Sequence, residues 1–169
     1  LASDNPDETV IEVDKSSDTN GVEIAIFNVE ETEGLNATID AIEVEFTIVD
    51  PAGGINPAGA GTVMRKAYLF VDGDEIGSES VPATADAVTV EFDNLDWDLS
   101  GDDDKDVSVV VDFDDTNTAT RYDNGTTVQV SSFEITELED ENGNDENDIT
   151  LLTTTAVGEI HEVRSEGIM

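Results

Sequence analysis

The sequence predicts an all-β protein, an antiparallel β-sandwich of seven to nine strands with an immunoglobulin-like or jelly-roll outline. Three observations lead to this prediction. Apolar and polar residues alternate along most of the chain, turn signals interrupt these runs at short intervals, and no window shows a helical period. Alternation with a period of two gives a strand one buried and one wet face, and such strands pack face to face in a sandwich.

The alternating runs define the expected strands. In the run AIEVEFTIV, Ile42 and Val44 share one face, whereas Glu43 lies on the other. Asp72-Gly73 suits the positive φ values of a type I′ turn, so it predicts a hairpin. The expected strands are residues 9–14, 21–31, 37–49, 64–71, 75–80, 87–92, 106–113, 126–138 and 148–164.

Two of these strands are expected to change phase. In residues 21–31 the apolar set passes from Ile24 and Ile26 to Phe27 and Val29. In residues 126–138 a similar change separates the first valines from the later phenylalanine and isoleucine. A β-bulge or a crossing between sheets produces such a change.

The first 14 residues are interpreted as an N-terminal strand that subunits can exchange, and residues 15–169 as the β-sandwich domain. Such a terminal strand either closes its own sheet as an edge strand or adds to the sheet of a neighbouring subunit. The residues expected to act as the polymerisation strand are Thr9, Val10, Ile11, Glu12 and Val13.

Acidic residues dominate the composition. The chain has 42 Asp and Glu against 6 Lys and Arg, for a net charge of −36, while 37% of its residues are apolar. Such a surface repels nucleic acid and anionic lipid, so both are excluded as partners. Either a hypersaline (halophilic) habitat or a calcium-loaded extracellular protein explains this charge, and the first is favoured.

Other features favour an exported protein. The chain has no cysteine, and no stretch approaches the ~20 apolar residues of a membrane span. It begins at Leu1 rather than Met, as a processed protein or a piece of a longer chain does. Asn36 and Asn124 each begin a sequon for N-glycosylation. We therefore expect an extracellular or cell-surface location.

Two acid-rich loops are candidate metal sites. Calcium prefers six to eight oxygen ligands, which short Asp/Asn loops between strands can supply. A third acid-rich segment, residues 111–125, is a weaker candidate. The alternative for each loop is a solvated, salt-adapted surface, so Ca²⁺ is a candidate cofactor only. The candidate ligands are Asp98, Asp102, Asp103 and Asp104 in the first loop, and Asp140, Asn142, Asn144, Glu146 and Asp148 in the second.

Catalysis finds little support in the sequence. His161 is the one histidine and is interpreted as a strand residue. Paired carboxylates for glycoside hydrolysis are disfavoured, because sugar clefts present aromatic platforms and this chain is poor in Trp and Tyr. Trp97, expected between two strands, is interpreted as closing one end of the sandwich. Arg121 and Arg164 are expected to pair with acids, either inside the chain or across a subunit contact, and internal pairing is favoured.

Four segments resemble a β-sandwich repeat domain of archaeal and bacterial surface proteins and extracellular filament subunits. They are AYLFVDGDEIGSES, VEFDNLDWDLSGDDDKDVSVVVDFDD, DNGTTVQVSSFEITELEDENGND and TAVGEIHEVRSEGIM. The likeness covers about residues 64–168. It implies a stalk, adhesin or filament subunit rather than an enzyme.

The leading hypothesis is a non-enzymatic structural subunit of an extracellular filament or cell-surface assembly. Its partners would be copies of itself, joined by β-strand and surface contacts. The alternatives are a module of a larger calcium-stiffened adhesin or surface-layer protein, and a carbohydrate-binding module that contacts surface glycans.

Overall fold

The predicted β-sandwich is confirmed. We describe residues 1–14, 16–49, 63–82, 87–115, 125–145 and 156–165 of a computed structural model, and these form nine strands and no helix. The strands are β1 (Val10–Val13), β2 (Thr19–Glu30), β3 (Ala37–Val49), β4 (Met64–Val71), β5 (Asp74–Ser80), β6 (Ala87–Leu99), β7 (Asp104–Phe113), β8 (Thr126–Asp140) and β9 (His161–Ser165).

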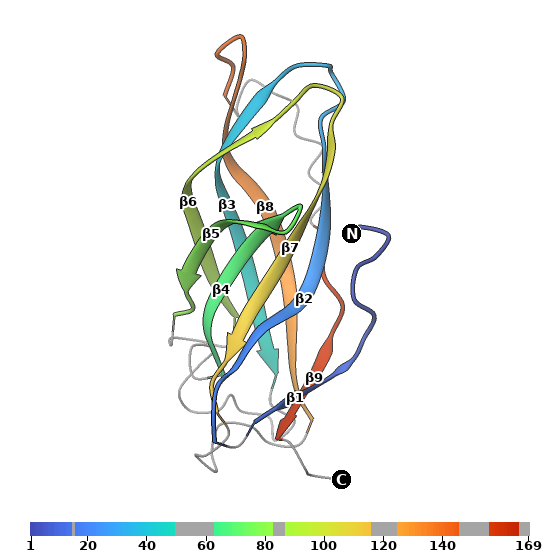
Figure 1. The fold of residues 1–169 in the computed structure, drawn as a ribbon, viewed down its shortest axis with the longest axis vertical. Coiled ribbons are helices and arrows are strands. Elements are labelled where there is room, and N and C mark those ends of the chain that lie inside the picture. The colour runs from blue at the N-terminus through green and yellow to red at the C-terminus, as the bar shows by residue number, and fades with distance from the viewer. Residues whose placement is uncertain (15, 50–62, 83–86, 116–124, 146–155, 166–169) are drawn as a thin grey trace.

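The strands form two sheets that pack face to face (Figure 1). One sheet has the order β1-β9-β8-β3-β6 and the other the order β2-β7-β4-β5. Neighbouring strands are antiparallel except for β1 and β9, which are parallel. Only the β4–β5 and β8–β9 connections stay within one sheet. At each of the remaining connections the chain passes from one layer to the other.

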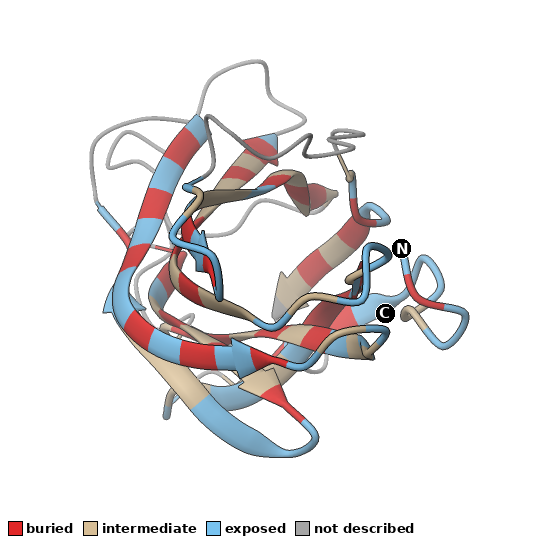
Figure 2. Ribbon diagram, turned by 90° about the horizontal axis from the view of Figure 1, so that it is seen from above, coloured by how far each residue is buried: buried red, intermediate tan, exposed pale blue. Residues whose placement is uncertain are grey.

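Apolar side chains from both sheets fill the space between the layers. Buried and exposed residues alternate along the strands (Figure 2), as the period of two predicts. The rings of Phe27 and Phe133 stack with their centroids 4.5 Å apart, which joins β2 to β8 across the sandwich. Phe46, Phe92 and Phe113 are also fully buried.

The predicted hairpin and phase changes are confirmed. Asp72 and Gly73 have φ values of 54° and 88°, as a type I′ turn between β4 and β5 requires. The β2–β7 register shifts between Glu23 and Ala25, and the β3–β8 register shifts opposite Ser131. Both are bulges, which return the later apolar residues to the core.

Two predictions about strand ends are wrong. Strand β6 continues to Leu99 rather than ending near residue 92, so Trp97 is a core residue within a strand and not a plug between strands. The sequence missed this extension because Asn94, with a φ of 55°, shifts the apolar phase inside β6. Gly21 lies within β2 at a bulge rather than in a turn.

The last predicted strand is also shorter than expected. Strand β9 begins at His161, and residues 157–160 are irregular. Gly158 donates its N–H to the carbonyl of Val130 at 2.8 Å, and a Cβ on Gly158 would lie 3.2 Å from that of Ala25. This segment therefore fills the side of the sandwich between β2 and β8. Predicted strand residues 148–155 lie outside the described residues.

Candidate functional site

The predicted polymerisation strand, β1, lies at one edge of the five-stranded sheet of its own chain. It pairs in parallel with β9, beginning with Val10 opposite Glu162. Ile11 is 7% exposed and Val13 0%, so both side chains belong to the core. Within one chain β1 is therefore an intramolecular edge strand, the first of the two alternatives. Its donation to another subunit stays a prediction.

Thr9 and His161 anchor the start of this strand. The Thr9 carbonyl accepts the N–H of Glu162 at 3.0 Å, and the Thr9 hydroxyl lies 3.3 Å from Nδ1 of His161. Nε2 of His161 lies 2.8 Å from the carbonyl oxygen of Ile24 on β2. A carbonyl can only accept, so Nε2 of His161 carries a proton. His161 is 1% exposed and is a strand residue, as predicted.

Other contacts of the N-terminal residues cover the free edge of β2. Ala2 donates its N–H to the carbonyl of Ile26 at 2.9 Å, and the Ile26 N–H donates to Oδ1 of Asn5 at 2.9 Å. Near the other end of β1, Arg164 pairs with Glu12 at 3.1 Å, which confirms the internal pairing predicted for Arg164. Residues 1–13 thus contact both sheets.

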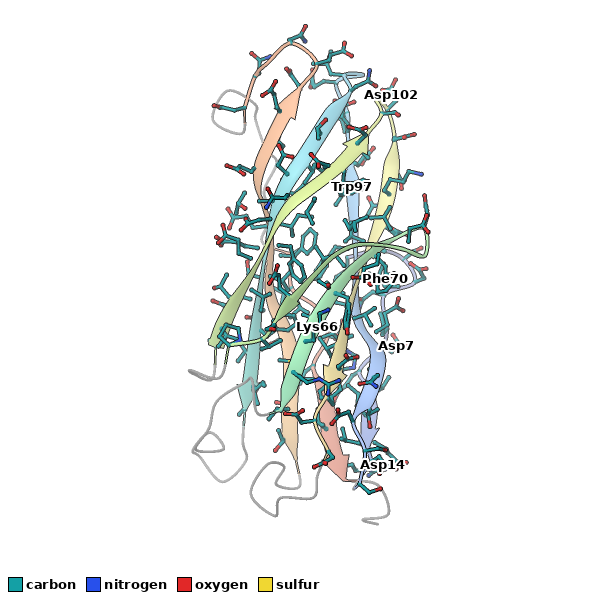
Figure 3. All side chains as sticks on the ribbon, turned by 60° about the vertical axis from the view of Figure 1, so that its left-hand side comes forward. Asp7, Asp14, Lys66, Phe70, Trp97 and Asp102 are labelled. Carbon is teal, nitrogen blue, oxygen red and sulfur yellow. The ribbon has the colours of Figure 1, made fainter. Side chains whose placement is uncertain are left out.

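A carboxylate that the sequence did not single out organises the opposite end of the molecule. Glu31 accepts four backbone N–H groups, from Glu33, Gly34, Leu35 and Asp102, at 2.8 to 3.1 Å. These bonds, that from Asp102 above all, lower the pKa of Glu31. Asp102 lies at one tip of the sandwich and Asp14 at the other (Figure 3).

Asn36 connects three loops at this tip. Its Nδ2 donates to a carboxylate oxygen of Glu141 at 2.7 Å, and its Oδ1 accepts the N–H of Gly101 at 3.1 Å. A Cβ on Gly101 would lie 2.4 Å from the carbonyl carbon of Gly34, so only glycine fits there. We call residues 31–36, 100–103 and 140–145 the loop junction.

The first predicted metal loop is dispersed by this arrangement. The Asp98 carboxylate accepts the Thr38 hydroxyl at 2.8 Å, and Asp104 accepts the Asn28 amide at 3.0 Å. Asp102 and Asp103 contribute backbone groups to the loop junction. The four predicted ligands therefore contact different neighbours rather than one another.

The second predicted metal loop is held together by its own hydrogen bonds. Asp140 accepts the backbone N–H groups of Asn142 and Asn144 and the side-chain amide of Asn144, at 2.8 to 2.9 Å. These bonds, led by the Asn144 amide, lower the pKa of Asp140. Three predicted ligands are thus hydrogen-bonded to one another, with the Asp140 carboxylate as the acceptor and the two asparagines as the donors. Glu146 and Asp148 lie outside the described residues.

Asn36, which begins a predicted sequon, is also a residue of the loop junction. Both polar atoms of its side chain are hydrogen-bonded, and the hydroxyl of Thr38 is bonded to Asp98. A glycan on Nδ2 would compete with the bond to Glu141. Glycosylation stays a prediction for Asn36, and Asn124 lies outside the described residues.

The third acid-rich segment contributes a buried carboxylate. Asp112 is 5% exposed and accepts the Tyr68 hydroxyl at 2.7 Å and the Gly21 N–H at 2.9 Å. Arg65 lies 3.5 Å from Asp112 and also pairs with Asp18. Arg121 and Asp123 lie outside the described residues.

The outer face of the five-stranded sheet is acidic. Glu43 on β3 lies directly opposite Glu91 on β6 and Glu134 on β8. We call these three side chains the glutamate row. The charge of Asp93, followed by burial and the charges of Glu43 and Glu137, raises the pKa of Glu91.

An open hollow continues this acidic face toward the loop junction. Its volume is about 740 Å³, and its lining includes Thr38, Asp40, Asp96, Asp98 and Glu139. Asp96 has a φ of 46°, which turns strand β6 beside the hollow. No Lys or Arg lines it, so the described surface here attracts cations of any kind.

Among the described residues, no group of three or more Asp, Glu or His side chains is arranged to hold a metal ion. Calcium binding stays a prediction. The described residues also contain no helix that is long and apolar enough to cross a membrane. No protein-family model, curated protein or solved structure matches the chain.

Proposed function

We propose that the chain is a non-enzymatic structural subunit of an extracellular filament or cell-surface assembly, in which copies join through exchange of strand β1. One observation carries this proposal. Strand β1 ends the sheet, and its one strand partner among the described residues is β9. A segment at the edge of a sheet can leave and be replaced without unfolding the rest.

The contacts of β1 also support exchange, because an identical strand from another copy satisfies all of them. Ile11 and Val13 would fill the same core positions, Glu12 would pair with Arg164, and Thr9 would bond to His161. Each subunit would give one strand and receive one. Such a head-to-tail contact forms an open polymer when the rotation between copies does not close a ring.

The turn after β1 is the expected hinge. The Asp14 carboxylate accepts the backbone N–H groups of Ser16 and Ser17 at 2.7 and 3.2 Å, and these bonds lower the pKa of Asp14. Extension of this exposed turn would direct β1 away from its own β9. The hinge thus loses three local hydrogen bonds on extension, including that from the Ser16 hydroxyl.

A pair of cysteines tests exchange directly, since the chain has no cysteine of its own. Glu12 and Arg164 are opposite each other in the β1–β9 register. In Glu12→Cys/Arg164→Cys, exchange predicts a ladder of disulfide-linked multimers on a non-reducing gel. A strand that stays in its own chain gives oxidised monomers only, and that result would contradict the proposal.

Deletion of residues 1–14 gives a second test. The shortened domain should stay folded and form no filaments in electron micrographs. Val13→Lys should have the same effect, because it places a charge in the core position of β1. The control is Val10→Lys, since Val10 is 44% exposed, and it should assemble normally. Filaments from the shortened protein would exclude the donor role.

A further inference from the structure

Strand β6 forms the other edge of the five-stranded sheet, and no described strand is hydrogen-bonded to its outer side. Its one strand partner is β3. Among the described residues, no backbone hydrogen bond joins β6 to any other segment. A long strand with an unpaired edge is a template for another strand, unless its sequence prevents this pairing.

The two halves of β6 differ in how that edge is protected. In the second half, Asn94 and Asp96 have φ values of 55° and 46°, and the register with β3 shifts. These irregularities, together with several acids, oppose the addition of a strand. In the first half, residues 87–92 pair with β3 without a shift. This half has no proline, bulge or inward charge, and its outward residues include Ala87 and Thr89.

From this contrast we propose that the first half of β6 pairs antiparallel with the same segment of a second copy, with Val90 on the two-fold axis. The contact is isologous and joins two five-stranded sheets edge to edge. It is separate from the exchange of β1, which occupies the opposite edge of the same sheet.

The charges and the length of the paired segment together select this register. Opposed residues share a face of a sheet, so the two residue numbers of a pair must sum to an even number. A centre at Glu91 would place Glu91 opposite Glu91 of the second copy. A centre at Phe92 would place Glu91 opposite Asp93 of the second copy. Like charges directly opposite each other are destabilising. Centres at Thr89 and at Val90 both avoid these contacts, and the centre at Val90 pairs more of the described residues, 87–93 rather than 87–91.

The selected register also makes favourable pairs. On the outer face, Thr89 lies opposite Glu91 of the second copy, and Ala87 lies opposite Asp93. On the inner face, Val88 meets Phe92 and Val90 meets itself, which extends the apolar layer. The first half of β6 is thus complementary to itself, which favours a second copy of this chain over an unrelated strand as the partner.

The net charge of −36 makes this contact dependent on salt. Two copies repel each other at low ionic strength, and about 1 M salt shortens the screening length to ~3 Å. Dimers should therefore increase with salt.

Cross-linking of the full chain tests the proposal. In Thr89→Cys/Glu91→Cys, each cysteine lies opposite a cysteine of the second copy, so oxidation in about 1 M NaCl should give covalent dimers. The control is Glu43→Cys/Glu45→Cys, which has the same spacing on β3. Strands flank β3 on both sides, so the control should give none. Equal yields from the two variants would overturn the proposal.

Charge substitutions at one position give an independent test. In Thr89→Glu, the new glutamate of each copy lies opposite Glu91 of the other copy, so two like-charged pairs form in each dimer. The dimer affinity measured by sedimentation equilibrium should therefore fall about tenfold. Thr89→Lys should strengthen it, because the pairs become opposite in charge. The same dimer affinity for both variants would contradict the register. Neither test depends on β1, so failure here leaves the exchange ladder of Glu12→Cys/Arg164→Cys unaffected.

Discussion

The loop junction and the glutamate row use the same kind of side chain in opposite ways. Glu31 accepts four backbone N–H groups, and its pKa is lowered. Glu91 faces other carboxylates, and its pKa is raised. The charge of an acid therefore stabilises the fold where donors surround it and destabilises the fold where acids surround it.

Both regions depend on backbone placement. At the loop junction, Gly34 and Gly101 let two loops approach closely enough for one carboxylate to reach donors from both. In the glutamate row, the regular register of three strands sets the carboxylates side by side. The net charge alone therefore cannot say which acids stabilise this protein.

Removal of the Glu31 carboxylate should produce the largest effect. In Glu31→Ala, four N–H groups that converge on one point lose their shared acceptor, and two loops lose their connection. The midpoint of urea unfolding should fall more than in any other single acid variant proposed here. The control is Glu33→Ala. It removes a carboxylate of the same charge from the same loop, but not the carboxylate that accepts the backbone N–H groups. A similar midpoint for both variants would refute the role of Glu31.

Asn36→Ala should be the next most destabilising change. It removes two side-chain hydrogen bonds that join three loops, which should lower the free energy of unfolding by about 1–2 kcal/mol. Unglycosylated protein must be measured, so that loss of a glycan does not contribute. Thr38→Ala also removes the sequon but keeps Asn36, so it should cost less. If the order were reversed, Asn36 would not hold the junction.

The pH dependence of stability should separate the two regions. Glu91, with a pKa raised above its ordinary 4.5, adds stability as pH falls through its folded-state pKa, because the folded chain binds the proton first. Glu31 and Asp140, with lowered pKa values, stabilise fully above their ordinary 4.5 and 3.8 and lose this contribution as pH falls through their folded-state values. Stability should therefore rise and then fall on acidification.

Single variants can show which acid causes the rise in stability on acidification and which causes the fall. Chemical unfolding across the acidic range should show a weaker rise for Glu91→Gln and a weaker fall for Glu31→Gln. Stability that falls steadily from neutral pH in the natural sequence would show that the glutamate row contributes nothing.

Glu43→Gln should have the smallest effect and the opposite sign. It removes the central charge of the row, so two like-charged pairs disappear and the melting temperature should rise slightly at low salt. This gain should vanish at about 1 M salt, where screening weakens the repulsion. Asp7→Asn, on the N-terminal segment (Figure 3), removes one charge outside the row and should give a smaller gain.

The alternation of apolar and polar residues was enough to predict the two-layer fold and most strands. Strand β6 shows where this signal fails, since Asn94 shifts the phase and hides the buried Leu95, Trp97 and Leu99 from a count of period two. Pairing between strands far apart in the sequence, such as β1 with β9 in the five-stranded sheet, has no local signature.

The roles of the acids were harder to predict. The composition of their loop predicts Asp140 and Asn144 as candidate metal ligands, and in the structure the Asn144 amide donates to the Asp140 carboxylate. Glu31 was overlooked, because its donors come from a loop about 70 residues away as well as from its own. The nearby Glu-Gly pair at residues 33–34 was the one local signal, and it is common in turns.

The parallel pairing of β1 with β9 also determines how the domain bears tension. A pull before β1 and an opposite pull after β9 would slide one strand along the other. The backbone pairs and the Glu12–Arg164 ion pair are then loaded in shear and must break together. Antiparallel end strands would instead unzip one pair at a time. After strand exchange, this shear clamp would lie between subunits, at the joint that transmits force along a filament.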